Sequence, residues 1–403
     1  MRLTLLVLEL VAACGSGTEP PARASTRDSS GVTIVENARP LAADSVAFLV
    51  DSAPAVEIGD AADPHEEFGR ISGVARLSEG VIVVADGGSQ ELRFFDSTGV
   101  WTRTTGGKGG GPGEFDMIGA VFPLGRDSLA VYDINHRRVS VFGADGSLGR
   151  EMTLSQAPDG FPFVLGVLGG DLLVRTEQFS QSLQSGSRRD TVPVVRYPRW
   201  TAPAVPLGRF PGTEMYVSVQ RNSAGLIAST MNTMLPFGRN LTLAAAGTRL
   251  YVGTADRYEI SAYDSAGTLI RLMRWTHSSV AVTDAEVAAM KRQRLEGFAP
   301  GEERFRDRVK DILEGMTFPS TKPAYDGFVV GDDGRLWVRR YDQPAVDLPA
   351  RYDLFDRDGQ WLGHVTFPPR FTLYHTGPGY ALGVWHDPDE VEYVRRYRLH
   401  STP

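Results

Sequence analysis

The feature that most restricts the fold of this chain is an internal repeat of 47 residues. Residues 66–99 match residues 113–146 without a gap. The matching positions all share this offset: Glu67-Phe68 with Glu114-Phe115, Ile71 with Ile118, Val74 with Val121, Asp86 with Asp133, Phe95 with Phe142, and Gly99 with Gly146. A period of about 40–50 residues is typical of the blades of a β-propeller.

Each repeat reads as four short strands that are separated by turns. In the first repeat, apolar residues alternate or run together over the expected strands Ile71–Leu77, Val81–Ala85, Glu91–Phe95 and Val100–Thr105. The turn Asp96–Gly99 supplies glycine where a hairpin needs a positive φ. The pattern therefore predicts antiparallel, four-stranded blades.

The number of blades follows from the aromatic residue that marks each expected third strand. There are six: Phe95, Phe142, Tyr197, Tyr263, Phe355 and Tyr397. The last unit lacks an obvious fourth strand, whereas Ala55–Gly59 forms a spare strand before the first repeat. We therefore predict an all-β, six-bladed β-propeller over residues 31–403, in which Ala55–Gly59 completes the sixth blade and removes two open edges.

Residues 283–317 predict a small α-helical insertion between blades 4 and 5. Thr283 and Glu286 form a capping box for a first helix. Apolar residues recur at helical spacing in a second helix: Phe305, Val309, Ile312, Leu313 and Met316. The insertion is either a helical hairpin packed against the propeller or a lid or partner-docking element at one mouth of the channel. The segment Met215–Phe237, with Met231 and Met234, can cover the same face.

The N-terminal segment has the organisation of a signal peptide over residues 1–13. Arg2 is followed by a short apolar stretch and by small residues before Cys14, the one cysteine of the chain. The run Val11-Ala12-Ala13-Cys14 resembles the lipobox of bacterial lipoproteins, although Glu9 departs from the pattern. The resemblance implies acylation of Cys14 and a protein anchored on the periplasmic side of the cell envelope or at the outer membrane. A simple secretory signal with an incidental cysteine is the alternative.

Residues 14–30 lack apolar periodicity, which predicts a flexible tether. No later segment has 18 consecutive apolar residues, so we expect membrane contact through the lipid alone. The formal net charge of −7 argues against nucleic-acid binding. We expect a monomer.

Two motifs resemble NHL repeats, a family of propeller blades. Asp133–Phe142 resembles the blade itself, and Gly109–Phe115 resembles the loop between blades. Together with the paired Glu-Phe motifs and Asp332–Arg339, these motifs make the chain similar to uncharacterised bacterial six-bladed β-propeller lipoproteins. That resemblance implies a fold and no particular chemistry. The relatives include protein-binding and RNA-binding modules and metal-dependent enzymes, so the function has to come from a site.

Three groups of residues are candidates for chemistry, each with a structural alternative. The glycine-rich run 106–113 lacks the Ser or Thr after Lys108 that a phosphate loop needs, and favours a turn between blades. His136 favours a structural hydrogen bond. The densest group of potential metal ligands is His375, His386, Asp387, Asp389 and Glu390. Asp387-Pro388-Asp389 is equally typical of a hairpin turn, so we expect no metal ligands there.

The sequence has no G-x-S-x-G, H-E-x-x-H or C-x-x-C motif and therefore indicates no catalytic residues. Five residues next to the expected inter-blade loops are candidates for a binding site at the channel mouth: Arg70, Glu114, Arg239, Lys322 and Tyr325. The first functional hypothesis is a membrane-tethered binding or scaffold protein with a protein or glycan partner and no cofactor. The alternative is a metal-dependent hydrolase or lactonase, with calcium as the possible cofactor in the central channel.

Overall fold

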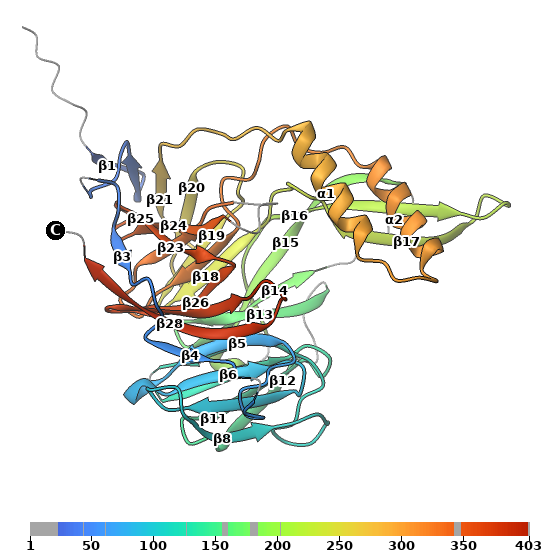
Figure 1. Ribbon diagram of the computed structural model, residues 1–403. Coiled ribbons are helices and arrows are strands. Elements are labelled where there is room, and N and C mark those ends of the chain that lie inside the picture. The colour runs from blue at the N-terminus through green and yellow to red at the C-terminus, as the bar shows by residue number, and fades with distance from the viewer. Residues whose placement is uncertain are drawn as a thin grey trace, which may run out of the picture.

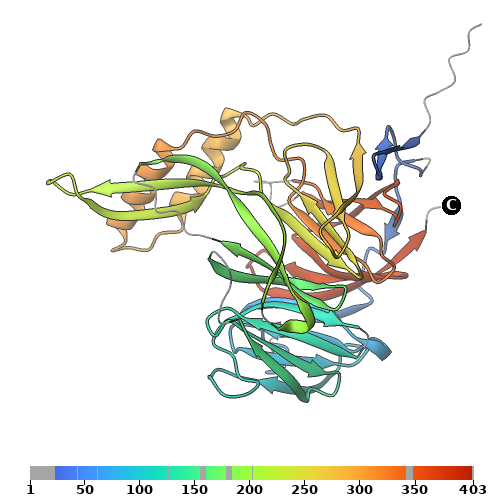
Figure 2. The ribbon, with the colours of Figure 1, turned by 180° about the vertical axis from the view of Figure 1, so that it is seen from behind.

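The computed structural model describes residues 23–401 except for 43, 61, 126, 155–159, 178–183, 202 and 342–347. Six β-sheets, each with an antiparallel blade, surround a common axis, which makes the fold an all-β, six-bladed propeller (Figures 1 and 2). In each blade the strands are given from the axis outward. Blade 1 consists of β5 (Ile71–Arg76), β6 (Ile82–Asp86), β7 (Glu91–Phe95) and β8 (Trp101–Gly106), and blade 2 consists of β9 (Ile118–Leu124), β10 (Ser128–Asp133), β11 (Arg138–Gly143) and β12 (Leu148–Thr153). Blade 3 consists of β13 (Phe161–Leu168), β14 (Asp171–Glu177), β15 (Gly186–Tyr197), β16 (Val205–Arg221) and β17 (Ile227–Met234).

The second half of the chain forms the other three blades in the same order. Blade 4 consists of β18 (Thr242–Ala246), β19 (Arg249–Gly253), β20 (Glu259–Tyr263) and β21 (Leu269–Trp275), and blade 5 consists of β22 (Gly327–Val330), β23 (Leu336–Arg339), β24 (Pro349–Phe355) and β25 (Trp361–Pro369). Blade 6 contains β26 (Phe371–Gly377), β27 (Tyr380–His386) and β28 (Glu392–Ser401). All six marker aromatics lie on the third strand of a blade, as predicted. Short 3₁₀ turns lie at Ser78–Gly80 and Pro198–Trp200.

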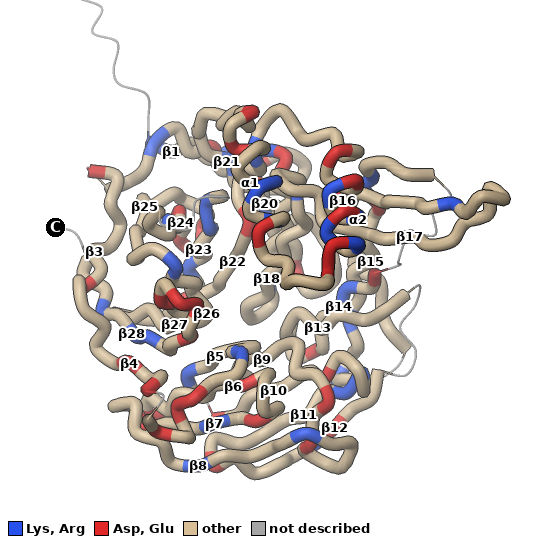
Figure 3. The backbone as a smooth tube through the Cα atoms, turned by 45° about the vertical axis from the view of Figure 1, so that its right-hand side comes forward, with Lys and Arg blue, Asp and Glu red and all other residues tan. Residues whose placement is uncertain are grey.

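The ring is closed around its axis by the innermost strands. Each of β5, β9, β13, β18, β22 and β26 contacts the next, and β26 contacts β5. Figure 3 shows these six strands facing one another around the centre. Six clusters of buried apolar side chains lie between neighbouring blades, one at each seam. The hydrophobic core is therefore a ring of interfaces rather than one central mass.

The predicted hairpin turns have a common local cause. In the turn after β7, the Asp96 carboxylate accepts hydrogen bonds from the backbone N–H groups of Thr98 and Val100, at 2.8 and 3.0 Å. Gly99 has a φ of 94°, which a residue with a Cβ rarely adopts. The turns that begin at Asp264 and Asp356 make the same carboxylate contacts.

The predicted closing strand is confirmed. Strand β4 (Val56–Ile58) pairs antiparallel with β28, with Ile58 opposite Val394 and Val56 opposite Arg396. A second short strand, β3 (Phe48–Val50), pairs with the far end of β28. Residues from before the first repeat thus form the outer edge of the last blade and join the two ends of the ring.

Part of the segment that was predicted to be a flexible tether forms a β-strand instead. Residues 14–30 were expected to be flexible, but β1 (Ala24–Ser29) and β2 (Val32–Asn37) form a hairpin. Strand β2 pairs in parallel with β21 and extends blade 4 at its outer edge. The alternating run Val32–Asn37 has β-branched residues that pair well with an open strand, and this pairing overrides the polar composition of its neighbour. Cys14 and the expected signal peptide lie outside the described residues.

The helical insertion lies between blades 4 and 5, as predicted, as α1 (Asp284–Glu296) and α2 (Glu303–Gly315). The capping box of Thr283 and Glu286 is present. The helices pack on the long β16–β17 hairpin, which projects from blade 3 beyond the ring (Figure 2). Their shared core contains Tyr216, Leu235, Phe237, Met290, Ile312, Leu313 and Met316. Phe305, expected on the apolar face of α2, is exposed instead and packs edge-on against Phe298. Neither helix is long and apolar enough to span a membrane, among the residues that the structure describes.

The position of the closing strand predicts that one of its side chains contributes strongly to the stability of the fold. Ile58 is fully buried at the seam between blades 6 and 1. We expect Ile58→Ala to lower the free energy of unfolding by about 2–5 kcal/mol, because it removes buried methyl groups and leaves a cavity. Urea-induced unfolding measures this loss.

The neighbouring Glu57 is the matched control, since its half-exposed carboxylate pairs with Arg395 on the outside of the same strand. Glu57→Ala should cost less than about 1 kcal/mol. Equal losses for the two variants would show that β4 does not hold the ring.

Candidate functional site

One face of the propeller carries all five residues that the sequence analysis singled out for binding. This face, called the upper face here, contains the loops that lead into the innermost strands and the turns between the second and third strands of each blade. Arg70 and Glu114 precede the innermost strands of blades 1 and 2. Arg239 precedes that of blade 4, whereas Lys322 and Tyr325 precede that of blade 5. The five residues therefore form two separate groups rather than one site.

In the first group, two equivalent aspartates organise the upper-face loops of blades 1 and 2. The Asp86 carboxylate accepts from the backbone N–H groups of Arg70 (3.1 Å) and Gly88 (2.8 Å). Asp133 accepts from the N–H groups of Asp116 (2.8 Å) and His136 (3.1 Å). The repeated Asp thus ties the loop that enters a blade to the turn of that blade.

His136 completes this arrangement in blade 2. Its Nδ1 lies 2.7 Å from Asp133, which confirms the predicted structural hydrogen bond. Burial alone would raise the pKa of the Asp133 carboxyl, but hydrogen bonds from the Asp116 and His136 backbone and the contact with the His136 ring outweigh it. The pKa of Asp133 is therefore lowered.

The glycine-rich loop is a turn between blades, as the sequence favours. Several of its backbone N–H groups already have acceptors within the protein. Gly107 donates to the Gln90 carbonyl, Gly109 to the Phe115 carbonyl, and Gly111 to the Glu114 carboxylate at 2.8 Å. Because these donors are engaged, the loop offers no cradle of free N–H groups to a phosphate. Glu114 holds this turn and does not contact the second group of candidates.

The residues considered as metal ligands are dispersed. His375 accepts from the Arg76 backbone N–H through Nδ1 (2.8 Å) and contacts Asp332 through Nε2 (2.9 Å). His386 contacts Glu392 at 3.2 Å. The Asp387 carboxylate caps the hairpin turn between β27 and β28. Across the described ranges, no three His, Cys, Asp or Glu side chains gather as a metal site would require.

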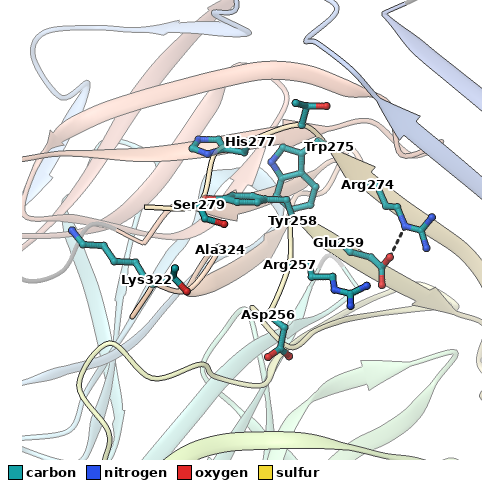
Figure 4. A pocket seen from close by; sticks show the side chains of 12 residues that line it. Asp256, Arg257, Tyr258, Glu259, Arg274, Trp275, His277, Ser279, Lys322 and Ala324 are labelled. Atoms are coloured by element: carbon teal, nitrogen blue, oxygen red, sulfur yellow. Dashed lines mark hydrogen bonds and ion pairs between the residues drawn. The ribbon is translucent and has the colours of Figure 1, made fainter. Parts of the chain in front are cut away.

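The second group lies beside a pocket between blades 4 and 5. The cavity has a volume of about 400 Å³. It is lined by the turn between β19 and β20, by the end of β21 with the chain that follows it, and by the chain that returns to β22 (Figure 4). The lining residues are Asp256, Arg257, Tyr258, Glu259, Arg274, Trp275, Thr276, His277, Ser279, Thr321, Lys322 and Ala324.

Aromatic rings form one wall of the pocket. Tyr258 stacks on His277, with ring centroids 4.5 Å apart and planes at 19°, and meets Trp275 edge-on. Trp275 is 5% exposed, and among the described residues its buried indole Nε1 has no hydrogen-bond partner. Burial raises the pKa of the Tyr258 hydroxyl, so this ring stays neutral. Figure 4 shows the three rings close together, with Glu259, Arg257 and Asp256 below them.

Tyr325 supports the pocket from below and does not line it. It is 1% exposed, and its hydroxyl donates to the Glu259 carbonyl at 2.7 Å and accepts from the Ala255 N–H at 3.3 Å. Ala255 has a φ of 58°, a left-handed conformation that costs energy for a residue with a Cβ. The buried hydroxyl therefore holds the strained turn that carries Asp256 to Tyr258. The ring of Tyr325, which was a candidate for binding at the channel mouth, is buried and fills the seam between blades 4 and 5.

Ion pairs connect the pocket to the helical insertion and to blade 3. Lys322 lies 2.6 Å from Glu286 at the start of α1, and this hydrogen bond is the largest cause of the lowered pKa of Glu286. Arg239 donates to the Thr321 hydroxyl at 3.2 Å and lies 3.5 Å from Asp256. Two of the five candidates, Lys322 and Arg239, thus stand at or next to the pocket.

The pocket residues with the clearest binding chemistry were not found from the sequence. Tyr258, Trp275 and His277 lie within 20 residues of one another at a blade whose boundaries fit the repeat poorly. One signal was present: Trp275 and His277 stand where the repeat stops and the helical insertion begins.

Comparisons with known proteins place the chain by fold. No family model and no curated protein matches it. A solved member of the DUF4221 family from Bacteroides vulgatus ATCC 8482 is 9% identical with a TM-score of 0.55, covering 89% of this chain and 100% of that one. A protein named as exported, from Bacteroides fragilis NCTC 9343, is 13% identical with a TM-score of 0.44, covering 91% and 99%.

Virginiamycin B lyase from Staphylococcus aureus is 10% identical with a TM-score of 0.41, covering 82% of this chain and 95% of that one. At these identities the likeness concerns the fold alone. The similarity to NHL repeats therefore stays a resemblance.

The lowered pKa of Asp133 predicts an acid-dependent contribution to stability. A carboxyl with a folded pKa below its unfolded value of about 3.9 stabilises the protein above that pH, and the contribution is lost as the pH falls below about 4. Asp133→Asn should lower the melting temperature at pH 7 and flatten its fall below pH 4. Asp358→Asn, at a site that is 76% exposed, is the control. An unchanged acid slope in Asp133→Asn would contradict the assignment.

Proposed function

We propose that this protein is an extracytoplasmic binding protein of the bacterial cell envelope, and that it holds a glycan in the pocket between blades 4 and 5. The observation that carries the proposal is the aromatic wall of Tyr258, His277 and Trp275 beside hydroxyl and charged side chains in one cavity.

The chemistry of the wall matches a sugar ring. The C–H face of a pyranose packs against an aromatic ring, while its hydroxyl groups hydrogen-bond to polar side chains at the rim. The hydroxyls of Thr276 and Ser279 line the pocket and make no side-chain hydrogen bond within the described part of the chain. A cavity of about 400 Å³ has the size of a small-ligand site, which suits one or two sugar units better than a folded protein surface.

The walls of the pocket are held by packing and hydrogen bonds within the protein. Its aromatic wall stands on the end of β21 and on a turn that Tyr325 fixes from below. The two chains that lead to and from the insertion pair with each other at Ala281 and Thr321. A preformed site avoids the cost of ordering loops on binding, which supports affinity from few contacts.

The proposed envelope location rests on the lipobox-like run that ends at Cys14. Nine residues separate Cys14 from Ala24 at the start of β1, and this stretch, fully extended, reaches at most about 35 Å. The β1–β2 hairpin pairs with β21, whose end carries Trp275. A lipid on Cys14 would therefore hold the pocket close to the membrane surface, where envelope glycans are available.

The glycan proposal is tested with a saccharide array and the full chain, purified in mild detergent. We expect binding to a subset of saccharides and a loss of about 10-fold in affinity for Tyr258→Ala, because one stacking partner of the sugar is removed. Tyr374→Ala, an aromatic at the channel and outside the pocket, should bind as the original chain does.

Thermal melting of both variants separates binding from folding. Binding lost equally in Tyr374→Ala and Tyr258→Ala, or a Tyr258→Ala variant that binds normally, would rule out this pocket as the glycan site.

The anchor is tested by labelling cells with radioactive palmitate. We expect label on the original chain and none on Cys14→Ser, with the variant released from the membrane fraction, because the thiol is the acylated group. Ser16→Ala is the control and should keep the label. Label that persists in Cys14→Ser would contradict the lipid anchor.

A further inference from the structure

All but one of the charged side chains that line the pocket have an oppositely charged partner within the described part of the protein. Asp256 is held by Arg189 of blade 3, whose guanidinium contacts both carboxylate oxygens at 2.8 and 2.9 Å. Lys322 is neutralised by Glu286 at 2.6 Å. A ligand group would have to displace an existing partner to bind either side chain.

Arg274 is engaged on both sides. It donates through Nε to Glu259, at 2.5 Å, and through a terminal nitrogen to Glu36, at 3.0 Å. Glu36 comes from β2 of the N-terminal hairpin, so a segment distant in sequence occupies this guanidinium. These contacts raise the pKa of Arg274, with the Glu259 hydrogen bond as the largest cause.

Arg257 is different. It lies on the turn between β19 and β20, it is exposed, and it lines the pocket between Asp256 and Tyr258. Among the residues that the structure describes, its guanidinium has neither an ion pair nor a hydrogen bond. In Figure 4 the one dashed line joins Arg274 to Glu259, and no dashed line reaches Arg257. The pocket therefore keeps one positive charge available to a ligand.

We propose that the pocket selects an acidic sugar with one carboxylate, such as a uronic acid, and that Arg257 is the residue that recognises this carboxylate. The inference rests on the proposed glycan function and adds the charge of the ligand. A guanidinium matches a carboxylate in plane and makes two parallel hydrogen bonds to it, which gives orientation as well as attraction. The Tyr258 ring, next in the chain, then packs against the sugar ring that bears the carboxylate.

The charge balance favours a carboxylate over a phosphate. A phosphate monoester carries about −2 near pH 7. With Arg274 and Lys322 already paired, one guanidinium would leave excess negative charge beside Asp256 and Glu259. A single carboxylate is neutralised by Arg257 alone.

The test uses matched pairs of saccharides that differ only in the acid: galacturonate and glucuronate disaccharides, and the same compounds as methyl esters. Affinities are measured by titration calorimetry with the full chain, at low and high salt. We expect the acid of the preferred pair to bind about 10–100-fold more tightly than its ester, in line with a charge-assisted pair. In Arg257→Gln this difference should fall below about 3-fold, while affinity for the ester is kept.

Arg292→Gln is the matched control, because Arg292 is an exposed arginine on α1 outside the pocket lining. It should keep the preference for the acid. Acid and ester that bind equally, or a preference that survives Arg257→Gln, would overturn this inference and leave the glycan function standing. Binding of neither form, together with an array on which no saccharide binds, would overturn both.

Discussion

The pairing of β4 with β28 is the interaction on which the rest of the structure depends. A propeller has no central core, because its apolar clusters lie at the seams between blades. An open seam would expose one such cluster and two strand edges. Here Val56 and Ile58, from the N-terminal side, complete the last blade and seal the seam with blade 1. The other five seams are held by chain connectivity in addition to packing.

The same architecture explains where a pocket can form. The seam between blades 4 and 5 differs from the others because the chain leaves it for the helical insertion and returns to it. The insertion cannot lie over the ring axis, since its apolar face is used against the β16–β17 hairpin of blade 3. Its two connecting chains therefore leave an opening at the seam, and the aromatic residues at the end of β21 line that opening.

Much of the fold was accessible from the sequence, because the first two blades keep an ungapped 47-residue repeat and each third strand keeps one aromatic residue. The start of α1 was also predictable, because the capping box of Thr283 and Glu286 is formed by residues close together in the sequence. The β1–β2 hairpin was missed because its polar strand is held by pairing with β21, which is distant in sequence. Of the pocket lining, Lys322 was among the candidates, but Arg257, Tyr258 and Trp275 were missed because they meet it only through the packing of two blades. The sequence also does not show which charged side chain of the pocket stays unpaired. That depends on the contacts of Asp256 with Arg189, of Arg274 with Glu36 and of Lys322 with Glu286.

The central claim is that the seam between blades 4 and 5 is the ligand site. Hydrogen exchange of the full chain, with and without the tightest-binding saccharide, tests it most directly. The account predicts slower exchange of backbone amides in residues 254–259, 274–281 and 321–324 and little change elsewhere, because these segments line the pocket. Slower exchange in the upper-face turns of blades 1 and 2, at residues 87–90 and 134–137, with none at the seam, would contradict it.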